Sequence, residues 1–208
     1  MDAKTREVRR HWQIEKDLIV PSEYTVLLRT KKGTVTIRED AEGVWVFEHG
    51  HAEALTRRRV HLPRFEGNQF DAVLRVLHQE LLINVVEGKP LPNLFVYSKP
   101  WYRDGAMMAM AFQKTGNLDL IRDWILGLQK PYDYNNAGEA EADNLGEALY
   151  LVSLVSNNSQ PIVKSILNEV PRFERDGGAY ICGRSDFAEH CAYQTKWLKF
   201  GLRALAVC

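Results

Sequence analysis

The chain has 208 residues, a length that suits one domain or one domain with a small appendage. Its 27 lysine and arginine residues balance 27 aspartate and glutamate residues, which argues against a nucleic-acid partner because such proteins usually carry excess positive charge. Hydrophobic residues make up 45% of the chain, but no apolar run reaches the ~18 residues of a membrane-spanning helix. We therefore expect neither a nucleic-acid nor a membrane partner.

The cysteines and the first residues bear on the cellular compartment. Cys182, Cys191 and Cys208 are three in number and cannot all pair within the chain, which fits a reducing environment better than secretion. The polar start, residues 1–7, has no apolar segment of the kind found in signal peptides. The sequence therefore predicts a cytoplasmic protein.

The first part of the chain, residues 1–66, has the pattern of short strands and turns. Residues 24–29, 34–38 and 44–47 are rich in β-forming side chains and are separated by turns at Gly33 and Gly43. This spacing predicts a small antiparallel β-meander of about three strands. Such a meander is marginally stable alone and should pack against something larger.

From residue 67 to residue 208 the pattern is helical. Apolar residues recur at helical spacing, and the boundaries carry helix signals such as Asn117, Pro161 and the capping-box pattern of Asn144 and Glu147. Six helices are expected, at about residues 70–85, 105–114, 117–128, 145–155, 160–170 and 190–208. Alternating short and long connections are typical of stacked helical hairpins. We therefore expect a mainly α chain with an N-terminal β-element at 1–66 and a helical domain at 67–208.

The last predicted helix shows no stop signal before Cys208. Its apolar residues point in several directions, as on a helix that is buried on more than one side: Trp197, Leu198, Phe200, Leu202 and Leu205. This pattern predicts either a fragment of a longer protein or one half of an assembly, and a homo-oligomer or a partner chain is the expected consequence.

The most informative stretch runs from Trp101 to Met108. Trp101 and Tyr102 precede the pair Arg103 and Asp104, which opens a helix. Aromatic faces stack on sugar rings, and a guanidinium beside a carboxylate offers donors and acceptors to vicinal hydroxyls. The alternative is purely structural, with Asp104 as helix cap, Arg103 as its ion-pair partner and Trp101 in the core.

Trp-x-Arg-Asp-x-Ala-Met at a helix entry resembles the sugar-binding motif of the six-hairpin glycosidases, the (α/α)6 toroids that include bacterial glucoamylases and trehalases. Residues 143–150 and 193–202 resemble further toroid segments, so the resemblance covers about 68–208. It implies a partial α/α toroid, because about six helices are present where a complete toroid has twelve. It also implies that Arg103 and Asp104 bind sugar hydroxyls, with Trp101 or Tyr102 as a wall.

Two acidic loops supply candidates for glycoside hydrolysis, which usually needs a pair of carboxyl groups. Glu141 and Asp143 are the candidate general acids, and neighbouring acidic groups would help either one to keep its proton. Asp186 and Glu189 lie in a second long loop and are expected to face the same cleft. The alternative is that both loops are solvated and merely cap the helices that follow.

A zinc site is a further alternative. Thiolate and imidazole are zinc ligands, so Cys182, His190 and Cys191 form a candidate set, although no C-x-x-C element is present. The sequence thus predicts a protein that hydrolyses or binds an oligosaccharide or glycoside without a metal or cofactor. The alternatives are a non-catalytic carbohydrate-binding or scaffold fragment and a zinc-dependent toroid enzyme.

Overall fold

A computed structural model describes residues 8, 10–55, 60–156, 160–185 and 188–207. The chain divides into two compact units, which are described separately. Unit 1 comprises Met1–Ile83 and Thr115–Asn117, and unit 2 comprises Asn84–Lys114 and Leu118–Cys208. Unit 1 thus includes the first predicted helix, which the sequence analysis assigned to the helical domain.

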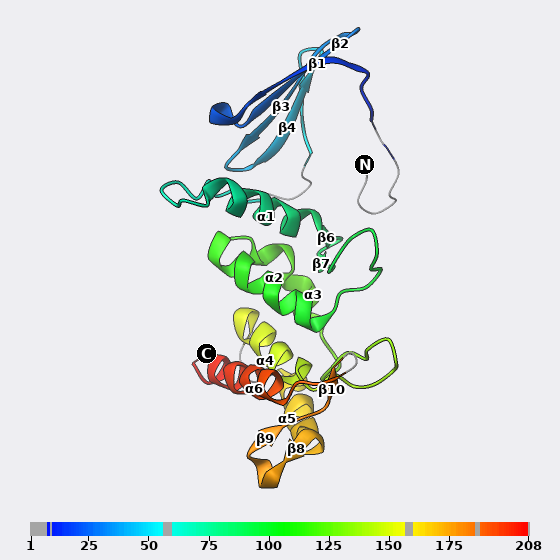
Figure 1. Ribbon diagram of the computed structural model, residues 1–208, viewed down its shortest axis with the longest axis vertical. Coiled ribbons are helices and arrows are strands. Elements are labelled where there is room, and N and C mark those ends of the chain that lie inside the picture. The colour runs from blue at the N-terminus through cyan, green and yellow to red at the C-terminus, as the bar shows by residue number, and fades with distance from the viewer. Residues whose placement is uncertain (1–7, 9, 56–59, 157–159, 186–187, 208) are drawn as a thin grey trace. The chain divides into compact units, whose positions relative to one another are not determined.

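Unit 1 contains a five-stranded antiparallel sheet with the strands in sequence order, shown in blue to cyan in Figure 1. The strands are β1 (Ile14–Val20), β2 (Thr25–Thr30), β3 (Gly33–Asp40), β4 (Gly43–Glu48) and β5 (His51–Ala54), with a 3-10 turn η1 at Pro21–Glu23. The three predicted strands correspond to β2, β3 and β4. Leu28 pairs with Val35 and Ile37 pairs with Val46, and together these residues form the apolar centre of the sheet.

Helix α1 (Asp71–Ile83) belongs to unit 1 and is tied to the sheet by polar contacts. The Arg75 guanidinium lies 4.0 Å from the centre of the Tyr24 ring, and Gln79 donates a hydrogen bond to Glu39. Buried His78 contacts Asn117, whose side chain also bonds the backbone of His61. Asn117 therefore anchors two chain segments and does not cap the helix that was predicted to start there.

Unit 2 contains the remaining elements. Its helical elements are α2 (Tyr102–Thr115, whose last residue belongs to unit 1), η2 (Leu118–Leu120), α3 (Arg122–Leu126), α4 (Asn144–Val155), α5 (Pro161–Phe173), η3 (Asp176–Gly178) and α6 (Cys191–Ala206). Three short two-stranded ladders pair β6 (Val85–Val86) with β7 (Lys89–Pro90), β8 (Glu174–Arg175) with β9 (Tyr180–Ile181) and β10 (Arg184–Ser185) with β11 (Ala188–Glu189). The predicted helix at 117–128 is thus broken into η2 and a short α3.

Helices α4 and α6 lie side by side, as the yellow and red helices of Figure 1 show, and glycines let their backbones approach closely. A Cβ atom on Gly146 would overlap the backbone of Trp197 and Leu198, and one on Gly201 would overlap the carbonyl oxygen of Gly146. This close approach joins two helices that are separated in sequence by α5 and the β8–β9 ladder. It places the start of α4 beside the middle of α6.

The expectation of a mainly α, partial α/α toroid is wrong. The structure is 43% helical and 24% strand, which makes it a mixed α and β protein with a five-stranded sheet. Strands β1 and β5 were not predicted from the sequence. Almost all their side chains are exposed, so they lack the alternation of apolar and polar residues that identifies a half-buried strand. The short ladders formed where loops were expected, except that Val85 of β6 was expected to end the first helix.

Two other observations bear on earlier expectations. Cys182 and Cys191 form a disulfide bond, whereas the number of cysteines led us to expect a reducing environment. Among the described helices, none combines the length and apolar character needed to cross a membrane.

Candidate functional site

Three of the predicted site residues, Arg103, Glu141 and Asp143, meet in unit 2. Arg103, in the first turn of α2, donates from Nε to Asp143 at 2.8 Å and from Nη2 to Glu141 at 2.7 Å. Both carboxylates are fully buried, whereas the Arg103 side chain keeps 26% of its surface exposed. All three residues are predicted site residues, but their arrangement as an ion-paired cluster was not predicted.

Asp143 is also held from the opposite side of the site. The Ser185 hydroxyl donates to its Oδ1 at 2.7 Å, and Gln194 of α6 donates to Ser185 Oγ at 3.1 Å. Gln194 further bonds the backbone N–H and carbonyl of Gly183. The carboxylate is therefore fixed by an arginine from α2 and by a hydroxyl that α6 holds in place.

Glu147 is a third buried carboxyl group, one turn into α4. Its two oxygens accept hydrogen bonds from Asn144 Nδ2 at 3.0 Å and from the Tyr193 hydroxyl at 3.4 Å. Burial raises the pKa of Glu147 well above its ordinary value, and the nearby negative charge of Asp143 raises it further. Burial and the neighbouring Glu147 also raise the pKa of Tyr193 to about 12.

The predicted capping box at Asn144 and Glu147 is replaced by this buried pair. Asn144 Oδ1 accepts a hydrogen bond from the backbone of Asp133, and Asp133 in turn accepts one from the backbone of Tyr102. These bonds connect the start of α4, the loop before it and the start of α2. They hold the acidic loop against the helix that carries Arg103.

The two aromatic residues expected to form a sugar wall lie in the protein interior. Trp101 and Tyr102 are 9% and 7% exposed, and the Tyr102 hydroxyl donates to the backbone of Lys130. Burial raises the pKa of Tyr102, and its ring packs edge-on against Trp124. Both aromatic side chains are therefore part of the interior packing and do not form an open wall for a sugar.

The other predicted site residues have different environments. Asp104 is half-buried and lies beside Arg103 in the first turn of α2. Glu189 is exposed in β11, and Asp186 lies outside the described residues. The structure thus joins Arg103, Glu141 and Asp143 directly. Asp104 is the neighbour of Arg103 in sequence, and Glu189 takes no part in the described ion pairs.

Residues that the sequence analysis did not assign to the site complete it: Asp133, Glu147, Ser185, Tyr193 and Gln194. A sequence signal was present for Glu147, the only charged residue in the otherwise apolar segment 145–155. A lone acidic residue there predicts a buried carboxyl group with polar partners. Ser185 and Gln194 carry no comparable signal, because their role depends on tertiary contacts.

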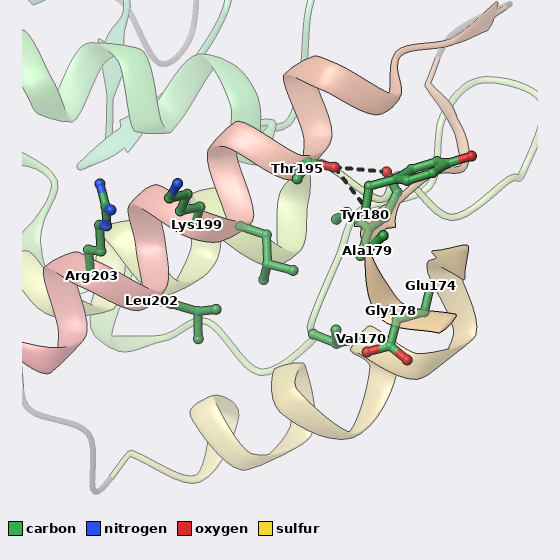
Figure 2. Close-up of a pocket in the computed structure, with 11 residues that line it drawn as sticks. Val170, Glu174, Gly178, Ala179, Tyr180, Thr195, Lys199, Leu202 and Arg203 are labelled. Carbon is green, nitrogen blue, oxygen red and sulfur yellow. Dashed lines mark hydrogen bonds between the residues drawn. The ribbon is translucent and has the colours of Figure 1, made fainter. Parts of the chain in front are cut away.

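A separate hollow of about 250 Å³ lies between α5, α6 and the β8–β9 ladder. Figure 2 shows Val170 and Leu202 among its apolar lining, with Lys199 and Arg203 on α6 and Glu174 at the other end. Thr195 bonds both the backbone N–H and the carbonyl of Ile181 at its edge. No predicted site residue lines this hollow.

Comparison with known proteins finds no matching family model, no similar curated protein and no similar solved structure. The resemblance to six-hairpin glycosidases is therefore wrong as a family assignment. Neither the comparisons nor the N-terminal five-stranded sheet supports it. The short Trp-x-Arg-Asp motif alone suggested a relationship that the whole chain does not bear out.

Proposed function

We propose that the chain binds a neutral oligosaccharide or glycoside at Arg103 and Asp104. The observation that carries the proposal is an arginine fixed by two fully buried carboxylates while part of its side chain remains exposed. A guanidinium ordered in this way loses little further entropy when it binds hydroxyl groups. The adjacent Asp104 carboxylate supplies an acceptor for the same kind of ligand.

The charge of the cluster favours a neutral ligand over an anionic one. Arg103 contributes one positive charge and the ionised Glu141 and Asp143 contribute two negative charges, so these three groups sum to minus one. A phosphate or carboxylate ligand would meet a guanidinium that is already neutralised, beside the further acidic group of Asp104. A polyhydroxyl ligand avoids this repulsion and can still use donors and acceptors.

Hydrolysis of a glycosidic bond is the second candidate function. It is supported by Glu147, because burial raises the pKa of this carboxyl group and so favours the protonated form that a general acid needs. Full burial of Glu141, Asp143 and Glu147 instead favours binding without catalysis, because none of these carboxyl groups reaches solvent. We therefore place non-catalytic carbohydrate binding first.

A thermal-shift screen tests the binding proposal. Neutral mono- and disaccharides are compared with their phosphorylated forms on the wild type and on Asp104→Asn. Asp119→Asn is the matched control, because Asp119 is 91% exposed on η2. We expect a neutral sugar to stabilise the wild type and the control but not Asp104→Asn. A screen in which all three proteins respond alike contradicts the assignment of Asp104.

The cytoplasm remains our proposed compartment. In a reducing cytoplasm the Cys182–Cys191 pair would exist as two thiols. Labelling of free thiols in cells lysed in the presence of a strong metal chelator tests this. Two reactive thiols from this pair support the cytoplasm, and complete protection from the label contradicts it.

A further inference from the structure

A second cluster of reactive side chains lies apart from the ion pairs of Arg103. Cys182 follows β9, Glu189 ends β11 and Cys191 begins α6. Their sulfur atoms and a carboxylate oxygen all lie within 4.8 Å of one another. Cys182 is buried, Cys191 is half-buried and Glu189 is exposed, so the cluster opens to solvent on the side of the glutamate. The carbohydrate proposal uses none of these three residues.

We propose that, when Cys182 and Cys191 are reduced, their thiolates and the Glu189 carboxylate bind one divalent ion of the zinc class. The ion and the disulfide exclude each other, because both need the same two sulfur atoms. The chain would then exist in two states, an oxidised form closed by the disulfide and a reduced form closed by the metal.

The donor set and its size fit such an ion. Thiolate and carboxylate are both zinc ligands, and ligand atoms of a tetrahedral zinc site lie roughly 3.5–4 Å apart. The Glu189 oxygen lies within 4.8 Å of both sulfur atoms, and the two sulfur atoms, now joined in the disulfide, would separate to the ligand spacing once reduced. Three protein ligands leave a fourth position for water. His190, the third ligand expected from the sequence, is exposed and not part of this group, and Glu189 takes its place.

Hydrogen bonds hold the two cysteines close even without the covalent bond. On one side of Cys182, Thr195 of α6 bonds the backbone N–H and carbonyl of Ile181. On the other side, Gln194 bonds the N–H and carbonyl of Gly183 at 2.9 and 2.7 Å. Four bonds to α6 therefore fix the backbone around Cys182 beside the start of the helix that carries Cys191. Reduction would leave the ligands largely in position.

The position of Cys191 favours a metal-binding thiolate. It is the first residue of α6, a helix of 16 residues. The positive end of a helix dipole stabilises a negative group at this position, and it does so for thiolates at helix N-termini. Carboxylate and thiolate then present the negative charge that a divalent ion needs.

The redox step balances with a named reductant. A trialkylphosphine cleaves the Cys182–Cys191 bond, supplies two electrons and becomes its oxide with oxygen from water. The two sulfur atoms take up two protons to form thiols. Binding of the ion then releases those two protons to solvent as the thiolates coordinate it.

Titration with Co²⁺ and then Zn²⁺ under anaerobic conditions tests the proposal. The full chain is reduced with phosphine, desalted and titrated with Co²⁺, with sulfur-to-cobalt charge-transfer absorption as the readout. We expect saturation at one equivalent, displacement by Zn²⁺ and no signal from the oxidised chain. Reduced protein without the charge-transfer band overturns the proposal.

Substitutions then identify the ligands. Glu189→Gln should weaken Zn²⁺ binding by at least tenfold, while Glu66→Gln, an equally conservative change of an exposed residue, should not. Cys182→Ser and Cys191→Ser should each abolish the cobalt band, and Cys208→Ser should retain it. Because Glu189 is exposed, its variant tests the site even if a cysteine variant fails to fold. Unchanged affinity in Glu189→Gln, or loss of the band in Cys208→Ser, refutes the three-ligand site.

Discussion

The guanidinium of Arg103 is the only positive group of the described ion pairs that contacts two fully buried carboxylates. A buried charge that loses its partner keeps the cost of desolvation without the compensating attraction. Arg103 and its two partners are therefore expected to stabilise unit 2 as a set, while Glu147 stabilises it as a neutral hydrogen-bonding group. These two roles lead to different predictions for the same Glu→Gln change.

Glu141→Gln should lower the free energy of unfolding by about 2 kcal/mol, because it replaces a buried charge-assisted hydrogen bond to Arg103 with a neutral one while Asp143 still pairs with the guanidinium. The measurement is urea denaturation at neutral pH. Glu139→Gln is the matched control, since Glu139 also pairs with an arginine, Arg184, but at the protein surface. The control should lose at most about 1 kcal/mol. An equal decrease in unfolding free energy in the two variants would show that burial of the Arg103 ion pairs does not contribute to stability.

Glu147 predicts a pH dependence of stability. Its pKa in the folded state lies well above the ordinary value of 4.5, so the folded state holds this proton more tightly than the unfolded state. The contribution of Glu147 to stability is thus fully present below about pH 4.5 and is lost as the pH rises through its folded-state pKa. Glu147→Gln cannot ionise, so its stability relative to the wild type should increase with pH. Unfolding free energies of both proteins from pH 4.5 to 8 measure this, and a difference that stays constant argues against a buried protonated Glu147.

At the scale of elements, the contact between α4 and α6 depends on two glycines. An added methyl group at Gly146 would overlap backbone atoms of Trp197 and Leu198, which cannot rotate away as a side chain can. Gly146→Ala should therefore lower the unfolding free energy by about 3 kcal/mol, at the upper end for overpacked cores. Gly127→Ala is the control, because its new methyl group would meet Asp123 only at 3.3 Å. Thermal denaturation measures both, and similar melting temperatures would contradict the close packing of α4 on α6.

The same elements show what the sequence could and could not predict. Helices α1, α2, α4 and α6 were located because their apolar spacing or flanking residues mark them locally. The helix expected at 117–128 is instead η2 and the short α3, and the Asn117 side chain that was expected to cap it bonds His61 and His78, which are 56 and 39 residues away. The contacts of the site were equally hard to predict, since Arg103 contacts Glu141 and Asp143, which are 38 and 40 residues away in sequence. The residue types indicated which side chains could carry chemistry, but which of them contact one another depends on the tertiary fold.

At the scale of the whole molecule, exposed apolar side chains predict association. Helix α1 has four that are more than half exposed: Val73, Val76, Leu77 and Ile83. A contiguous apolar face favours protein contacts, and a net charge of zero provides no long-range repulsion to oppose them. We expect a molar mass that rises with concentration in size-exclusion chromatography with light scattering. Leu77→Glu should reduce this rise, and Gln13→Glu, which adds the same charge at another exposed position, should not. A constant monomer mass in the wild type contradicts the prediction.

The most direct test of the account is isothermal titration of a neutral sugar from the thermal-shift screen into three proteins. The wild type and Asp119→Asn should bind it with equal affinity, and Asp104→Asn should bind at least tenfold more weakly while unfolding at the same urea concentration. Equal affinity in all three proteins, or no binding of any neutral sugar to the wild type, would contradict a carbohydrate site at Arg103 and Asp104.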